Sequence, residues 1–235
     1  MTSTSFPLTQ RSAVLGAHSD DPAVRERSWS ALVSAYWRPA YKHVRIKWKA
    51  NAEDARDSIQ GFFEKALERE FFARYQPEVA RFRTFFKTCL DRYVSNELKA
   101  ATRQKRGGPA VGLAFDDAEL ELERAGAAAW ESPDDAFERE WRRQLFMNAL
   151  ATLEQRAKDQ GKHAAWMAFQ KYDLSEPPRP RYDELAKELN VPATTVTNYL
   201  SWARGQLRTL VLEQLETITA TEQELSVEAQ AAGVA

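Results

Sequence analysis

The stretch YDELAKELNVPATTVTNYLSWARGQLR, residues 182–208, decides the fold of the C-terminal part of the chain. Apolar residues recur at helical spacing in two runs, first Leu185, Ala186 and Leu189, then Val196, Leu200, Ala203 and Leu207. Between the runs, Asn190 tolerates the left-handed backbone of a tight turn, and Pro192 suits the first position of a helix. The stretch therefore predicts two short helices joined by a tight turn.

The second of these helices has a polar outer face. Its members are Thr194, Thr195, Thr197, Asn198, Ser201 and Arg204. Small hydrogen-bonding and cationic side chains are expected on a helix that lies in a DNA major groove. Polar outer faces are also the norm on surface helices, so an ordinary helical hairpin with a solvated face is the alternative.

Composition favours an all-α protein of one or two domains. The chain has 235 residues, of which 43% are hydrophobic and 29% charged, with nine glycines and many Ala, Leu, Glu and Arg residues. Its single cysteine, Cys89, excludes a disulfide framework and a CxxC-type metal site. No run is apolar and long enough to cross a bilayer, and no secretory segment follows Met1. We expect a cytoplasmic protein without membrane insertion.

Charge is strongly segregated although the net charge is only −1. Residues 79–108 hold eight basic residues against two acidic ones, whereas residues 113–140 hold ten acidic residues against two basic ones. A basic helix of this kind suits a phosphate backbone. Within and before the acidic stretch, residues 109–133 have little apolar periodicity, and their charge favours an extended, soluble linker.

Helical periodicity and breakers give the expected organisation: two helical domains joined by an acidic flexible linker. We predict a polar N-terminal tail at 1–19, a first helical domain at 20–108 and the linker at 109–133. The second domain, with the helix-turn-helix, is predicted at 134–216. The Ala-, Glu- and Gln-rich end, 217–235, is expected to be disordered.

Sequence patterns of catalysis are absent. The histidines His18, His43 and His163 are far apart, and no HExxH, P-loop, GxGxxG or GxSxG pattern occurs. Glu53, Asp54 and Asp57 cluster at the start of a predicted helix, where carboxylates usually interact with the helix dipole or face a partner. We therefore expect no catalytic residue, no metal site and no cofactor.

Three blocks, in order, resemble the bacterial RNA polymerase sigma factors of the sigma-70 family, in particular the extracytoplasmic-function group. Residues 52–66, AEDARDSIQGFFEKA, resemble region 2.2, which docks on the beta-prime clamp of core RNA polymerase. Residues 81–106 resemble regions 2.3 and 2.4, which melt and bind the −10 promoter element. Residues 182–208 resemble region 4, which binds the −35 element. Together the blocks span most of residues 20–216.

The resemblance implies three sets of site residues. The implied polymerase-binding residues are Glu53, Asp54, Asp57 and Gln60. The implied −10 set is Arg83, Phe85, Arg92, Asn96, Lys99, Arg103, Lys105 and Arg106. The implied −35 set is Thr194, Thr195, Thr197, Asn198, Ser201, Arg204 and Arg208. In this segment, aromatic rings that hold unstacked bases would alternate with cations that contact the DNA backbone. For Phe82 and Phe86, which lie outside the −10 set, packing in the protein core is the favoured role.

The chain departs from the family pattern at three of these positions. Phe85 stands where the family usually has tryptophan, Arg92 where many members have asparagine, and Thr197 where arginine or lysine is frequent. The departures concern which bases are read rather than the role of each segment. We therefore expect promoter preferences that differ from those of other members.

The resemblance implies a promoter-specificity subunit without catalytic activity. Its partners would be core RNA polymerase, through the beta-prime clamp and the beta flap, and promoter DNA. An anti-sigma factor or a regulatory kinase would be a further partner, as in many relatives. A stand-alone helix-turn-helix regulator and a helical adaptor protein are the alternatives. The stand-alone regulator does not account for the acidic helix near Glu53 or for the aromatic-basic segment that follows Arg81.

Overall fold

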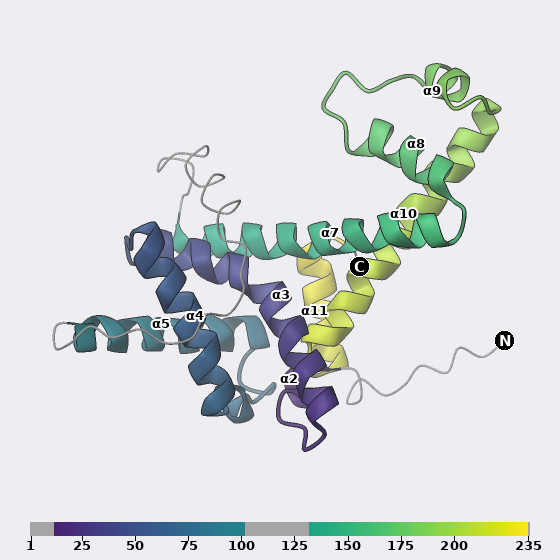
Figure 1. The fold of residues 1–235 in the computed structure, drawn as a ribbon. Coiled ribbons are helices and arrows are strands. Elements are labelled where there is room, and N and C mark those ends of the chain that lie inside the picture. The colour runs from purple at the N-terminus through teal and green to yellow at the C-terminus, as the bar shows by residue number, and fades with distance from the viewer. Residues whose placement is uncertain (1–11, 102–131, 235) are drawn as a thin grey trace. The chain divides into compact units, whose positions relative to one another are not determined.

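A computed structural model describes residues 12–101 and 132–234, and every regular element in these two ranges is a helix (Figure 1). The prediction of an all-α fold is confirmed for them. The elements are α2 (Ala13–Gly16), α3 (Pro22–Lys47), α4 (Ala52–Glu68), the 3-10 helix η1 (Phe71–Arg74), α5 (Phe82–Ala101), α7 (Pro133–Asp159), α8 (His163–Asp173), α9 (Tyr182–Glu188), α10 (Ala193–Ile218) and α11 (Glu222–Ala232).

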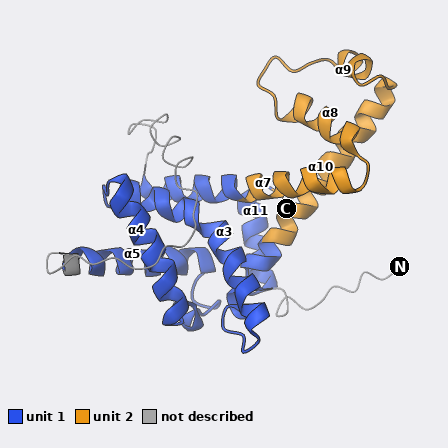
Figure 2. Cartoon of the chain, viewed as in Figure 1, with its two compact units in different colours: residues 1–144, 215–233, 235 blue, residues 145–214, 234 orange. Residues whose placement is uncertain are grey.

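The chain forms two compact units, but their boundaries differ from the predicted domains (Figure 2). Unit 1 comprises residues up to 144 together with 215–233, and unit 2 comprises 145–214 with residue 234. Both α7 and α10 contribute to each unit. The compact units therefore do not coincide with the predicted domains, because the first turns of α7, up to residue 144, pack in unit 1 rather than with the helical pair. The predicted linker at 109–133 lies almost wholly outside the described residues.

Unit 1 is built around aromatic side chains. Helix α3 begins after Asp21, whose carboxylate accepts a hydrogen bond from the Ala23 amide at 2.8 Å, and continues through Pro39. It packs against α2, α4 and α5. The rings that fill the core are Tyr36, Phe62, Phe72, Phe82 and Phe86, each at most 2% exposed. Core positions for Phe82 and Phe86 are thereby confirmed.

Both ends of the chain correct the sequence-based expectations. Residues 12–19 were predicted to be part of a polar tail, but Ser12, Ala13, Val14 and Ala17 are buried where α2 packs on α3. The predicted disorder of 217–235 is wrong for residues 217–234, which complete α10 and form α11. The Thr221 hydroxyl caps α11 by accepting a hydrogen bond from the Glu224 amide at 3.1 Å. Apolar and acidic side chains of α11, among them Ala229, Ala232, Glu224 and Glu228, are buried in unit 1.

Unit 2 contains the predicted helical pair. Helix α8 precedes it, and α9 and α10 follow in the predicted order, joined by residues 189–192. Leu185 and Ala186 of α9 are buried, as are Val196, Leu200 and Ala203 of α10. The apolar periodicity of this stretch thus predicted the buried faces of both helices.

Candidate nucleic-acid interface

The turn between α9 and α10 is set by local backbone hydrogen bonds. Asn190 has φ 52°, the left-handed conformation that the sequence predicted. Its amide donates to the Lys187 carbonyl at 3.2 Å, and the Val191 amide donates to the Ala186 carbonyl at 3.0 Å. This pair of bonds is the Schellman motif that ends a helix and reverses the chain. The turn therefore fixes where α10 begins.

The start of α9 is held by a carboxylate. The Arg181 amide donates to Glu184 Oε2 at 2.8 Å, which satisfies one of the amides that a helix N-terminus leaves without a partner. Tyr182 packs edge-on against Tyr172 of α8, with ring centroids 4.9 Å apart. These contacts join α8 and α9, so the helical pair rests on α8 within unit 2.

The outer face of α10 gathers the predicted base-contacting residues. Thr194, Thr197, Asn198 and Ser201 are exposed and are spaced i, i+3, i+4 and i+7, which places them on one stripe of the helix. Thr195 is half-buried and lies off the stripe. The stripe presents hydroxyl groups and one amide, the groups that hydrogen-bond to base edges in a major groove.

Both arginines of the predicted −35 set have partners inside the protein. Arg204 forms a two-pronged pair with Asp173 of α8, with Nε–Oδ2 and Nη2–Oδ1 distances of 2.9 and 3.0 Å. Hydrogen bonding to Asp173 raises the pKa of the Arg204 guanidinium. Arg208 Nε donates to the carbonyl of Val234 at 3.0 Å. A DNA phosphate that binds either arginine would therefore share the guanidinium group with its present partner or displace that partner.

The predicted −10 set is only partly brought together on α5. Arg92, Asn96 and Lys99 are exposed at spacings of four and three residues, so they share one face of the helix. Phe85 is half-buried, with its ring 5.4 Å from that of Tyr75. Arg103, Lys105 and Arg106 lie outside the described residues.

The placement of Arg83 corrects the expectation that it faces DNA. Its side chain is 4% exposed, its Nη1 lies 2.6 Å from Glu138 of α7, and its Nη2 lies 2.8 Å from Glu228 of α11. The guanidinium stacks on the Trp141 ring at 3.9 Å from the centroid. An arginine with two carboxylates and a ring around it cannot reach a DNA phosphate in this conformation.

The acidic residues of the predicted polymerase contact lie along α4. Asn51 caps this helix, its Oδ1 accepting a hydrogen bond from the Asp54 amide at 2.8 Å. Glu53, Asp54 and Asp57 are exposed and Gln60 is half-buried. Glu53, Asp57 and Gln60 are spaced four and three residues apart, so they form one stripe.

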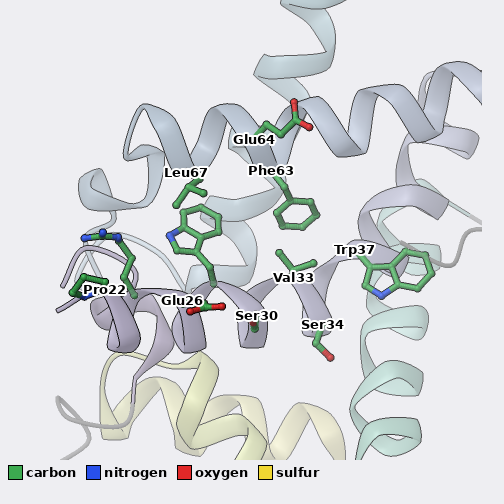
Figure 3. A pocket seen from close by; sticks show the side chains of 11 residues that line it. Pro22, Glu26, Ser30, Val33, Ser34, Trp37, Phe63, Glu64 and Leu67 are labelled. Atoms are coloured by element: carbon green, nitrogen blue, oxygen red, sulfur yellow. The ribbon is translucent and has the colours of Figure 1, made fainter. Parts of the chain in front are cut away.

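A groove of about 680 Å³ lies between α3 and α4 in unit 1 (Figure 3). Its apolar walls come from Trp29, Val33 and Trp37 of α3 and from Phe63 and Leu67 of α4. Glu64 and Leu67 continue the stripe of Glu53, Asp57 and Gln60 at helical spacing. The acidic stripe of α4 therefore runs into the groove.

Asp91 organises the junction of α3 and α5, a role that sequence reasoning missed. It accepts hydrogen bonds from Lys47 Nζ at 2.7 Å and Trp48 Nε1 at 3.1 Å, and it lies 3.0 Å from His43 Nε2. Burial raises the pKa of Asp91, but the hydrogen bonds from His43 and Lys47 more than offset this and hold it at about 2. These contacts connect α5 at Asp91 to the C-terminal end of α3.

Sequence reasoning also missed Glu224 and Glu228 of α11. A signal for Glu224 was present in Thr221-Glu-Gln-Glu224, a pattern of the capping-box type that marks a helix start. Glu228 and Trp141 carry no local signal, because their partner Arg83 lies in a distant part of the chain.

Two kinds of site are not found in the described parts of the chain. Residues 12–101 and 132–234 contain no group of three or more His, Cys, Asp or Glu side chains placed to hold a metal ion. No helix in the same ranges is long and apolar enough to cross a membrane.

Comparisons of the chain with protein-family profiles, curated proteins and solved structures find no significant match.

Proposed function

We propose that the protein is a promoter-specificity factor of the sigma type, which binds core RNA polymerase, contacts the −10 and −35 promoter elements and promotes transcription initiation. The observation that carries the proposal is the outer stripe of α10. Four exposed hydrogen-bonding side chains stand on the first turns of a helix whose start is fixed by the turn at Asn190. This arrangement suits a recognition helix.

Two further surfaces favour a sigma factor over a stand-alone helix-turn-helix regulator. Helix α5 exposes Arg92, Asn96 and Lys99 on one face, which suits contact with DNA bases and phosphates. Helix α4 exposes the acidic stripe of Glu53 and Asp57, which suits a basic protein partner. A regulator that only binds duplex DNA needs neither surface.

In this mechanism α10 would lie in the major groove of the −35 element, where Asn198 could form paired hydrogen bonds with an adenine. The acidic stripe of α4 would dock on the polymerase clamp, and α5 would contact the −10 element. Each DNA contact is modest alone. Their joint attachment to the polymerase raises the effective concentration of each for its element.

Run-off transcription with bacterial core RNA polymerase tests the proposal. Asn198→Ala should reduce initiation at a responsive promoter by about fivefold to 150-fold, because a good paired contact to a base contributes about 1–3 kcal/mol. Thr209→Ala on the same helix is the matched control, because Thr209 is exposed and lies about two turns beyond Ser201, the last residue of the stripe. Tight duplex binding without any initiation would instead support the stand-alone regulator.

A further inference from the structure

Helix α11 places two buried carboxylates on the first turn of α5. Glu224 is 6% exposed, and its Oε1 accepts a hydrogen bond from the Phe82 amide at 2.5 Å. Glu228 is 2% exposed and lies 2.8 Å from Arg83 Nη2 and 3.8 Å from Arg81 Nη1. All of these residues belong to unit 1 (Figure 2). The start of the basic helix α5 is therefore covered by acidic groups from the end of the same chain.

The groups that α11 covers are those that bind phosphates in nucleic-acid complexes. Guanidinium groups and backbone amides at a helix N-terminus are the usual donors to phosphate oxygens. Glu224 and Glu228 present carboxylate oxygens to the same donors. Carboxylates of α11 and phosphates of DNA would thus compete for Arg81, Arg83 and the Phe82 amide.

The contact at Glu228 is poised for exchange. Burial raises the pKa of Glu228, although the charges of Arg83 and Arg81 lower it. Neither Glu228 oxygen accepts a hydrogen bond of good geometry, so charge rather than directed bonding holds the carboxylate. A buried ion pair loses much of its Coulomb energy to desolvation, so its net contribution is small. A ligand with many phosphates can displace such a contact.

We propose that α11 is an intramolecular acidic cap, which occupies a phosphate-binding site at Arg81, Phe82 and Arg83 and yields it to DNA. The proposal rests on the proposed function, because it assigns α5 to nucleic acid. Glu138 of α7 also pairs with Arg83, so displacement of α11 opens the Nη2 edge of Arg83 and exposes Arg81 further. The cap therefore limits DNA binding in the protein before it meets a promoter.

DNA affinity of full-length variants provides the first test. A fluorescein-labelled single-stranded DNA oligonucleotide of mixed sequence is titrated at several salt concentrations. Glu228→Gln should raise affinity about threefold to tenfold and steepen the plot of log K against log salt by about 0.7 for each arginine that gains a phosphate. Glu222→Gln is the matched control, since it removes one charge from an exposed position on the same helix.

A third variant links the gain to the proposed site. Adding Arg83→Gln to Glu228→Gln should return the salt slope toward that of the unaltered protein. Equal effects of Glu228→Gln and Glu222→Gln would overturn the proposal, because they would reflect net charge alone. A gain that persists without both Arg81 and Arg83 would overturn it as well.

Hydrogen–deuterium exchange tests the cap without DNA. The Phe82 amide is in the first turn of α5, where intrahelical acceptors are missing, so Glu224 should account for its protection. Glu224→Ala should speed exchange around Phe82 while leaving the core of unit 1 protected. Unchanged exchange there, or exchange that rises only with unfolding of the whole unit, would show α11 to be structural and overturn the proposal.

The proposed cap and the proposed sigma function can be refuted independently of each other. If Glu228→Gln strengthens DNA binding and no variant supports initiation with core polymerase, the cap stands and the sigma function is wrong. If the unaltered protein initiates transcription while Glu228→Gln changes neither affinity nor slope, the sigma function stands and the cap is wrong.

Discussion

Replacement of Glu140 by glutamine is expected to destabilise unit 1 more than replacement of its main partner, Lys42. Glu140 Oε2 lies 2.7 Å from Lys42 Nζ, and the two side chains are 2% and 3% exposed. Glu140 Oε1 also lies 3.8 Å from Arg38 and 3.7 Å from Arg143. One buried carboxylate thus interacts with three cations and connects the first turns of α7 to α3.

The expected losses of unfolding free energy differ because Glu140→Gln removes the carboxylate near three cations, whereas Lys42→Met removes only one of those cations. At 2.7 Å the attraction between the two charges is about 6 kcal/mol for an effective dielectric constant of about 20, and desolvation of both ions offsets much of it. Glu140→Gln leaves three cations close together without their shared carboxylate, so we expect a loss of about 3–5 kcal/mol. Lys42→Met leaves Glu140 beside two arginines, so we expect a loss of about 1.5–3 kcal/mol.

Urea unfolding of the full-length protein, followed by circular dichroism, measures these losses. The double variant Lys42→Met/Glu140→Gln should be less destabilised than the sum of the single variants, because it leaves neither charge of the pair buried. Glu154→Gln is the matched control on the same helix, since its pair with Lys158 has a similar distance, 2.8 Å, but both side chains are more than 40% exposed. It should change stability by less than about 1 kcal/mol. Additive losses, or equal losses for Glu140→Gln and Glu154→Gln, would refute the reasoning.

Three further predictions concern the turn, the α3–α5 junction and the arginine pair of unit 2. Asn190→Val should lower stability by about 1–2 kcal/mol in thermal unfolding, because φ is 52° there, while Asn190→Gly should be neutral or slightly stabilising. Asp91 has its pKa lowered from 3.8 to about 2, so its contribution is present above pH about 4 and is lost as the pH falls toward 2. After a discount for solvent screening we expect about 1 kcal/mol, and unfolding of Asp91→Asn should lack this pH dependence. Arg204→Ala should lower stability by less than about 1 kcal/mol, since its side chain is 48% exposed. If Arg204 exchanges Asp173 for a phosphate, the same variant should reduce the salt slope of duplex binding by about 0.9, whereas an unchanged slope would assign it to structure alone.

Local patterns predicted the helical pair of unit 2 well. The left-handed Asn190 and the buried Val196 and Leu200 follow from spacing and turn chemistry over a few residues. Composition was misleading at the end of the chain, where Ala, Glu and Gln suggested disorder. Glu224 and Glu228 instead find amide and guanidinium partners on α5, and such partners are visible only in three dimensions.

The candidate site was predictable to a similar extent. Exposure of Thr197, Asn198 and Ser201 follows from the periodicity of α10 alone. The burial of Arg83 does not, because it depends on Glu138, Trp141 and Glu228 from two other helices. The unit boundary within α7 was equally hidden, because helical periodicity continues without a break across it.

Reconstituted initiation on a library of randomised promoters tests the central claim most directly. Core RNA polymerase with the purified protein transcribes the library, and sequencing of the transcripts identifies the start sites and the upstream DNA. The sigma function predicts enrichment of two sequence blocks, one near −35 and one near −10, with the −35 block altered by Asn198→Ala. Absence of protein-dependent transcripts, or transcripts with no shared upstream sequence, would contradict it.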